Sequence, residues 1–226
     1  ASAYMLWDED VDDLILAGAA RLVVPEDNLV LGSTAVTSTA TELNLLDGAG
    51  TLNYVGKQTI WVPSNAMSPT ESNGCADITG VETTSGRPDM YVLDFDTSSD
   101  EFAQFSVAFP KSWNLGTVTY QVFWSGIAAT TGVKWQLQGV AMADNETIDV
   151  AYGTFGGVDD DSQGSATELL VSAESGAVTI AGTPADNDLC YFRIGRDVSG
   201  GNDDMAGDAR LHGIKVFFTT DAANDA

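Results

Sequence analysis

Alternating apolar and polar positions mark two long strands in the middle of the chain. The apolar residues occupy every second position, Val118, Tyr120, Val122 and Trp124 in one run and Val133, Trp135 and Leu137 in the next. Because successive side chains of a strand point to opposite faces, these residues are expected in a core. Thr119, Gln121, Lys134 and Gln136 are expected outside. The short loop between the runs suits a hairpin.

A change of parity follows in the second run. After Gly139 the apolar positions become Val140 and Met142. An inserted residue that shifts a strand's alternation is a β-bulge, and glycine accommodates one readily. The sequence therefore predicts a bulge at Gly139.

Shorter runs of the same kind occur before and after this pair. They predict strands at residues 58–62, 90–95, 101–109, 147–152, 168–171, 177–181, 188–198 and 211–219. In the strand 188–198, Cys190, Phe192 and Ile194 are expected inward, and Tyr191, Arg193 and Arg196 outward or at the rim. Residues 64–89, rich in Ser, Thr, Asn, Gly and Pro, predict one long loop. The pattern is typical of an all-β, antiparallel, jelly-roll-like sandwich spanning residues 57–226.

The first 56 residues follow a different pattern. An aromatic and apolar patch at residues 4–7 precedes an acidic run and a second apolar patch. Residues 4–7 are expected to pack either on the body of the chain or against another protein. Further on, Thr39 and Glu42 have the spacing of a capping box, which predicts a short helix that begins there. A helix of about eight residues does not persist unpacked in water.

Residues 28–48, NLVLGSTAVTSTATELNLLDG, resemble the TAVTATATELNYLDG segment of tailed-bacteriophage fibre and virion-surface proteins. In that family the segment occurs in trimeric shafts, where three chains pack about one axis. The resemblance implies that residues 1–56 anchor the chain to other virion proteins and form a homotrimer. It implies assembly only and brings no catalytic residue.

Charge restricts the partners of the chain. The 226 residues include 33 Asp and Glu against 9 Lys and Arg, for a net charge of −24, and 24 of the acids are Asp. Such a surface repels nucleic acid and anionic membranes. No basic and apolar leader or run of 18 apolar residues is present, so neither a classical secretion signal nor membrane insertion is expected. The two cysteines, Cys75 and Cys190, have no metal-ligand spacing, and Cys190 is expected as a buried thiol.

Few residues suggest chemistry. His212, the only histidine, lies in a predicted strand, where a hydrogen-bonded structural role is expected. No nucleophile-elbow, P-loop or zinc-protease motif occurs. Residues 159–164 resemble the start of a calcium loop but lack its closing Glu, and residues 201–204 form a second acidic turn. Solvated acidic turns are the preferred interpretation of both, and calcium binding stays open. Trp113 and Tyr152, at strand ends, are candidates for stacking on sugars.

These observations predict a virion structural protein without catalytic, cofactor or metal site. It would project from a tailed phage particle as a fibre, spike or decoration and contact a glycan or protein of the host surface. One alternative is a cement protein that stabilises the capsid shell. Another is a carbohydrate-active enzyme on a jelly roll. The sequence does not distinguish a head from a tail location.

Overall fold

A computed structural model of the chain describes residues 55–225 without a break. Before them it describes residues 4–8, 13–17, 24, 30–31, 34–35, 37–39 and 41–42. The chain divides into two compact units, Ala1–Leu52 and Asn53–Ala226. Among the described residues, no helix is both long enough and apolar enough to cross a bilayer.

The N-terminal unit contains two small antiparallel pairs. Strand β1 (Tyr4–Asp8) pairs with β2 (Asp13–Ala17). Strand β3 (Val30–Leu31) pairs with β4 (Thr34–Ala35). The backbone of residues 4–7 is thus a strand. The structure does not describe their side chains, so the packing expected of them stays a prediction.

The predicted capping box is confirmed. The Thr39 backbone N–H and hydroxyl both donate to Oε2 of Glu42, at 2.8 and 2.9 Å, and the Glu42 N–H donates to the Thr39 hydroxyl at 3.3 Å. These bonds hold the pKa of Glu42 below its usual value. Thr41 and Glu42 are helical, and the remainder of the predicted helix lies outside the described residues.

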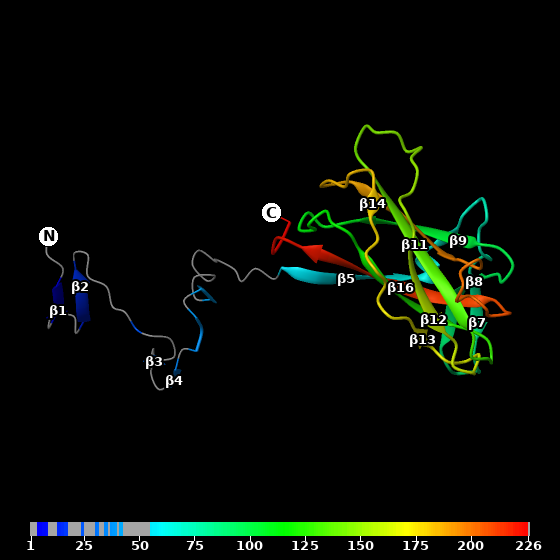
Figure 1. Cartoon of the computed structure of the whole chain (residues 1–226), viewed down its shortest axis with the longest axis horizontal. Helices are drawn as coiled ribbons and strands as arrows, with labels where there is room; N and C mark the ends of the chain where they lie inside the picture. The colour runs from blue at the N-terminus through cyan, green and yellow to red at the C-terminus, as the bar shows by residue number, and fades with distance from the viewer. Residues whose placement is uncertain are drawn as a thin grey trace. The chain divides into compact units, whose positions relative to one another are not determined.

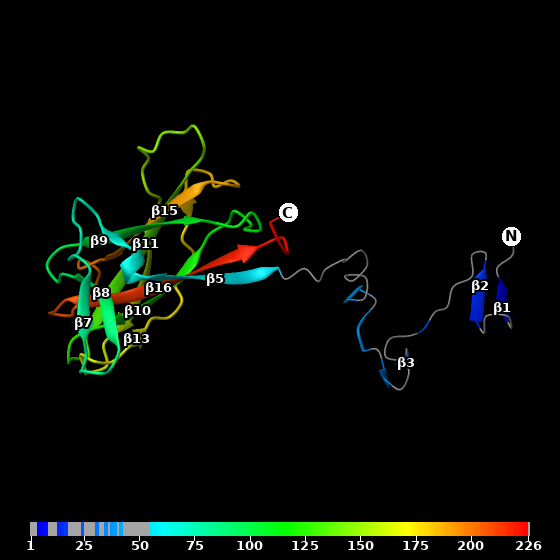
Figure 2. The same cartoon turned by 180° about the vertical axis from the view of Figure 1, so that it is seen from behind.

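The C-terminal unit is a jelly-roll-like sandwich of two six-stranded sheets, seen from opposite sides in Figure 1 and Figure 2. The first sheet has the order β13 (Leu170–Val171), β10 (Thr119–Ser125), β16 (Ala209–Thr220), β8 (Asp89–Phe95), β7 (Thr79–Glu82), and β5 (Gly56–Pro63) also pairs with β16. The second has the order β12 (Gly156–Asp161), β11 (Gly132–Met142), β15 (Leu189–Arg196), β9 (Glu101–Ala108), β6 (Ser68–Pro69), and β14 (Ile180–Ala181) pairs in parallel with β11. A single 3-10 turn, η1 (Ser64–Ala66), follows β5 in this unit. The predicted all-β sandwich is confirmed.

The core lies between the two sheets. Tyr120, Val122, Trp124, Trp135 and Leu137 are all fully buried, as their alternation predicts. The Trp124 and Trp135 rings meet edge to face, with centroids 6.0 Å apart. Both thiols, Cys75 and Cys190, are free and buried, and burial raises the pKa of each to about 12. The prediction of a buried Cys190 thiol is thus confirmed.

The predicted hairpin of the two central strands is wrong. β10 belongs to the first sheet and β11 to the second, so residues 126–131 cross from one sheet to the other. The two tryptophans therefore face each other across the core and do not lie side by side within one sheet. Alternation correctly predicts which face of each strand is buried, but it carries no information about the pairing partner.

The predicted bulge at Gly139 is also wrong. The register of β11 against β15 is continuous from Trp135 to Met142, so Leu137 and Val140 lie on opposite faces. Val140 is nevertheless buried, because the segment after β11 covers this outer face. Gln136, expected in water, is buried on the same face. The bulge of the sandwich lies instead in β16, where the pairing with β10 shifts between Phe123 and Trp124.

Several predicted strand positions need correction. Residues 64–89 are not one loop, because they contain β6 and β7. Residues 147–152 form a loop, and the strand β12 occupies residues 156–161, where Gly and Asp predicted a turn. β12 pairs with β11 along its whole length, so a neighbouring strand overrides the weak strand propensity of its own residues.

Arg196 was expected outward or at the rim, and this is wrong. Its side chain is fully buried at the end of β15. Its Nε and Nη2 donate to the two carboxylate oxygens of Asp203, at 2.9 and 2.7 Å. Its remaining N–H groups donate to the carbonyls of Phe95, Met205 and Gly207. All five guanidinium donors are thus satisfied, which makes burial of the charge tolerable.

Removing the carboxylate should therefore destabilise the sandwich. Asp203→Asn leaves the Arg196 charge buried without its counterion, and we expect the free energy of unfolding to fall by about 3–5 kcal/mol. Urea denaturation of the full chain measures this change. Asp186→Asn, which removes the same charge from an exposed position, should change it by less than about 0.5 kcal/mol. Equal stability of the two variants would contradict the role assigned to the buried pair.

Candidate functional site

Trp61 lies on the outer face of the first sheet and leaves 48% of its surface exposed. It stands in β5 directly opposite Lys215 of β16. Its ring meets the Phe123 ring of β10 edge to face, with centroids 5.1 Å apart and planes at 85°. The two rings therefore form an aromatic surface across three strands, which we call the Trp61 platform.

The backbone of β16 makes room for this platform. Gly213 pairs with Phe123 on one side and with Pro63 on the other. A Cβ atom at Gly213 would lie 2.7 Å from two carbon atoms of the Trp61 ring, and the residue has a φ of +153°. Both observations favour glycine here, because any side chain would displace the indole.

Two lysines border the same face. The Nζ of Lys215 lies 5.1 Å from the centroid of the Phe123 ring, and the Nζ of Lys57 lies 5.3 Å from that of Phe217. Lys57 also pairs with Glu174 at 2.5 Å, and this contact, together with a hydrogen bond from Thr119, lowers the pKa of Glu174. Positive charge and aromatic surface thus coincide in a strongly acidic protein.

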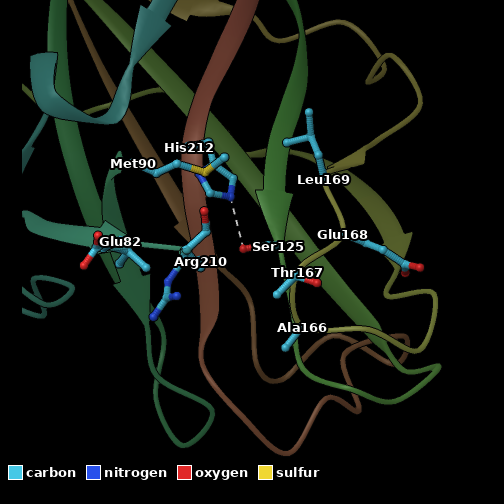
Figure 3. Close-up of a pocket in the computed structure, with 11 residues that line it drawn as sticks. Glu82, Met90, Ser125, Ala166, Thr167, Glu168, Leu169, Arg210 and His212 are labelled. Carbon is cyan, nitrogen blue, oxygen red and sulfur yellow. Dashed lines mark hydrogen bonds between the residues drawn. The ribbon is translucent and has the colours of Figure 1, made fainter. Parts of the chain in front are cut away.

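A cleft of about 190 Å³ continues this face beyond the bulge (Figure 3). Its floor is formed by Ser125, Arg210 and His212, from β10 and β16. Residues 81–83 and Met90 form one wall, and residues 166–169 form the other. Ser125 lies two positions after Phe123 on the same face of β10, so the cleft adjoins the platform.

His212 lies on the bulge of β16 and turns toward β10. Its Nε2 and the Oγ of Ser125 are 3.0 Å apart, and the hydrogen bond between them is the dashed line in Figure 3. Burial and the neighbouring Arg210 guanidinium hold the pKa of His212 below its usual value, against a smaller opposing effect of Asp94. The predicted strand position and hydrogen bond of His212 are confirmed.

Charged groups of both signs line the cleft, one Arg and two Glu. Arg210 donates from Nε and Nη2 to the two oxygens of Asp94, at 2.9 and 3.1 Å, which raises its pKa. Glu82 and Glu168 lie on opposite walls in Figure 3, and both are exposed. Next to them, Met90 and Leu169 add apolar surface. The cleft therefore offers donors, acceptors and apolar groups to a ligand rich in hydroxyls.

The two acidic turns singled out in the sequence come together in a separate depression. Asp159, Asp160 and Asp161 line it with Asn202 and Asp204, around a space of about 550 Å³. The Asn202 amide donates to Asp159 at 2.5 Å. Residues 159–164 and 201–204 are far apart in the sequence, so no local pattern predicted that they would be neighbours.

Most of the carboxylates in these turns are engaged by the protein itself. Asp160 accepts from the Trp124 indole at 2.6 Å, Asp203 from Arg196, and Asp204 from the Gly132 N–H at 2.7 Å. Burial raises the pKa of Asp160. Within the described part of the chain, no three His, Cys, Asp or Glu residues are grouped so as to hold a metal ion. The interpretation of both segments as solvated acidic turns stays a prediction.

The two aromatic residues suggested for sugar stacking have different surroundings. Trp113 is buried and packs on Phe109 with ring centroids 4.3 Å apart, so it cannot present a face to a ligand. Tyr152 is half-buried and lines a groove of about 330 Å³ on the outer face of the second sheet, with Tyr191 and Ile148. The prediction for Trp113 is wrong, because its loop folds back against the core.

Arg193 fixes the loop that carries Tyr152. Its guanidinium lies 4.1 Å from the Phe102 ring centroid and 5.2 Å from that of Tyr152. Its Nε and Nη2 donate to the Gln138 oxygen, and the Gln138 amide donates to the Gly153 carbonyl at 2.7 Å. This face of the sandwich is thus largely closed by its own chain.

The Trp61 platform and the cleft were missed in the sequence. The signal for Trp61 was present, because Ile60 and Val62 share the apolar parity of a strand and leave Trp61 on the other face. The cleft carried no comparable signal, since its residues come from five separate segments of the chain.

No known protein-family model matches this chain, and no curated protein matches it in sequence. It is similar in structure to a family 35 carbohydrate-binding module from Clostridium thermocellum, at 11% identity over 70% of this chain and 97% of that one, with a TM-score of 0.40. It is also similar to the C-terminal family 22 module of Clostridium thermocellum Xyn10B, at 10% identity over 72% and 93%, with a TM-score of 0.42. At these identities and TM-scores, no functional residue is transferred from either.

The ionisation of His212 is directly measurable. As the only histidine, it gives a single imidazole C2–H resonance, whose titration midpoint should lie below about 6.5. Arg210→Gln should raise the midpoint, because it removes a repelling charge and frees Asp94. Since the unfolded chain binds the proton at the ordinary pKa, stability should fall as the pH drops below about 6.5 and level off below the folded-state pKa. A midpoint at or above 6.5 would contradict the buried, neutral imidazole.

Proposed function

We propose that this protein is a non-enzymatic structural protein of a tailed-phage virion, and that its sandwich binds a glycan of the host surface. The observation that carries the binding function is the half-exposed Trp61 indole, held against Phe123 beside a polar cleft. The apolar faces of sugar rings stack on flat aromatic rings, while their hydroxyls need hydrogen-bonding groups nearby. The first sheet supplies both on one face.

The burial pattern supports a ligand surface over a purely structural role for Trp61. Trp113, Trp124 and Trp135 are 3% exposed or less, whereas Trp61 exposes about half of its surface. Exposed tryptophan forfeits burial worth about 25 cal/mol per Å² of apolar surface. A ligand that covers the indole would recover this free energy.

The virion assignment is supported by residues 28–48, whose resemblance to phage fibre segments includes the capping box at Thr39 and Glu42. We propose that residues 1–56 dock on other virion proteins and assemble three chains, which would place the sandwich on the particle surface. A net charge of −24 disfavours contact with nucleic acid or insertion into an anionic membrane.

A second candidate function, capsid-stabilising cement, is favoured by one specific feature. The groove next to Tyr152 exposes 85% of Ile148, 38% of Val150 and 41% of Leu189. Such apolar surface would be covered if neighbouring shell subunits packed against this face. Locating the chain in intact particles by cryo-EM distinguishes the two functions, since cement requires the groove to contact shell protein and a receptor-binding role requires the Trp61 platform to face outward.

Trp61→Ala should abolish most glycan binding and leave the fold intact. We expect the affinity for a bound oligosaccharide to fall about tenfold or more, because a ligand would no longer cover on the order of 100 Å² of apolar indole surface, at about 25 cal/mol per Å². The full chain is first applied to an array of bacterial surface glycans, and the affinity for each glycan retained is then measured by calorimetry.

Tyr91→Ala is the matched control, since Tyr91 is 61% exposed in β8 of the same sheet and does not line the cleft. It should bind as the unmodified chain does. Absence of any glycan ligand, or equal affinities of the two variants, would overturn the assignment of the platform.

Assembly gives an independent prediction. Light scattering on the full chain in physiological salt should report three times the mass of one 23.7 kDa chain. Leu43→Asp, which places a charge among the apolar residues of the capped segment, should shift the mass toward that of one chain. A monomeric unmodified chain would refute the trimer.

A further inference from the structure

Basic side chains are scarce in this protein, and most of them are neutralised. The described residues contain eight Lys and Arg. Four of them form ion pairs, Lys57 with Glu174, Lys134 with Asp197, Arg196 with Asp203 and Arg210 with Asp94. Arg193 is bound to Gln138 and to aromatic rings, and Arg87 and Lys111 lie in exposed turns.

Lys215 is different from all of these. It lies in the middle of a sheet face, and within the described chain no carboxylate oxygen is within 4 Å of its ammonium. Its neighbours across the strands are Trp61 on one side and Gln121 on the other. The ammonium rests 5.1 Å from the Phe123 ring centroid.

The composition makes this lack of an acidic partner informative. With 33 acidic residues for 9 basic ones, a carboxylate partner is easily available in such a chain. The amide of the neighbouring Gln121 is itself held by the Ser172 carbonyl at 2.8 Å. A cation–π contact alone contributes only about 0.5–1 kcal/mol at an exposed site. Lys215 therefore retains donors directed to the surface on which a ligand would stack.

We propose that the glycan bound on the Trp61 platform is acidic, and that its carboxylate pairs with Lys215. This inference rests on the proposed glycan-binding function and specifies the class of sugar. A ring stacked on Trp61 has Lys215 as its immediate neighbour on β16. The flanking cations Lys57 and Arg210 are already paired with Glu174 and Asp94. Lys215 is therefore the cation that would distinguish an acidic glycan from a neutral one.

The acidic surroundings sharpen this selectivity. Glu174, Asp94, Glu82 and Glu168 lie on the same side of the sandwich and repel an anion that approaches anywhere but the centre of the platform. A carboxylate gains a charge-assisted hydrogen bond only where it reaches the Lys215 ammonium. Its position on the sheet is thereby fixed relative to Trp61.

The test compares acidic oligosaccharides with their neutral counterparts. A panel of carboxylated oligosaccharides is prepared in matched pairs, in which one member has each carboxylate reduced to a primary alcohol. Calorimetry on the full chain should show that the carboxylated member of a bound pair binds roughly tenfold or more tightly. Lys215→Gln should remove this preference and leave the affinity for the neutral member nearly unchanged.

The outcomes separate this inference from the proposed function. If Trp61→Ala weakens both members of a pair and Lys215→Gln weakens only the acidic one, the inference holds. If the unmodified chain binds both members equally through Trp61, the proposed function stands and the acidic specificity is wrong. If a glycan of the bacterial array binds through Trp61 but no member of the panel does, the acidic specificity alone is overturned, and if no glycan binds at all, both are. Lys111→Gln, at an exposed turn, serves as the control for loss of one positive charge.

Discussion

The sandwich depends on the burial of one guanidinium group. Arg196 lies at the end of β15 in the second sheet, yet it donates to the Phe95 carbonyl of β8 in the first sheet and to three positions of the segment 203–207. A charge without water requires every donor to be satisfied, and the two sheets together with this segment satisfy all of them. Trp124 packs on Trp135 between the two sheets, and Arg196 links the end of β15 to β8 of the other sheet.

The two outer faces of the sandwich differ because one is covered and the other is not. Over the second sheet, the segment after β11 folds back and is held through Gln138, Arg193 and Tyr152. Over the first sheet, no described segment covers Trp61, and the lack of a side chain at Gly213, next to the bulge, lets its indole lie across the strand. Each face thus has a cation packed on aromatic rings. On the second sheet, Arg193 and its rings hold a covering segment in place, whereas on the first sheet Lys215 and its rings stay accessible.

Much of the fold follows from local alternation, whereas the site does not. Parity correctly identified the buried sides of β10, of β15 as far as Ile194 and of β11 as far as Leu137, because each strand has one face in the core. It could not indicate that β10 and β11 belong to different sheets, since both arrangements bury the same side chains. Arg196 was misjudged because its compensating partners, Asp203 and three carbonyls, are set by tertiary structure. Parity would also have placed Trp61 outside, although that prediction was not made, and the cleft beside it is assembled from distant segments that no local pattern connects.

The burial of both cysteines has a practical consequence for labelling this protein. Cys75 and Cys190 are 6% and 0% exposed, and burial raises the pKa of each thiol to about 12. Maleimide and disulfide reagents react with thiolates, which are almost absent from both positions at neutral pH. A cysteine introduced on any exposed turn would therefore be the single reactive site of the native chain, and fluorophores or gold clusters could be attached there without first removing the natural thiols.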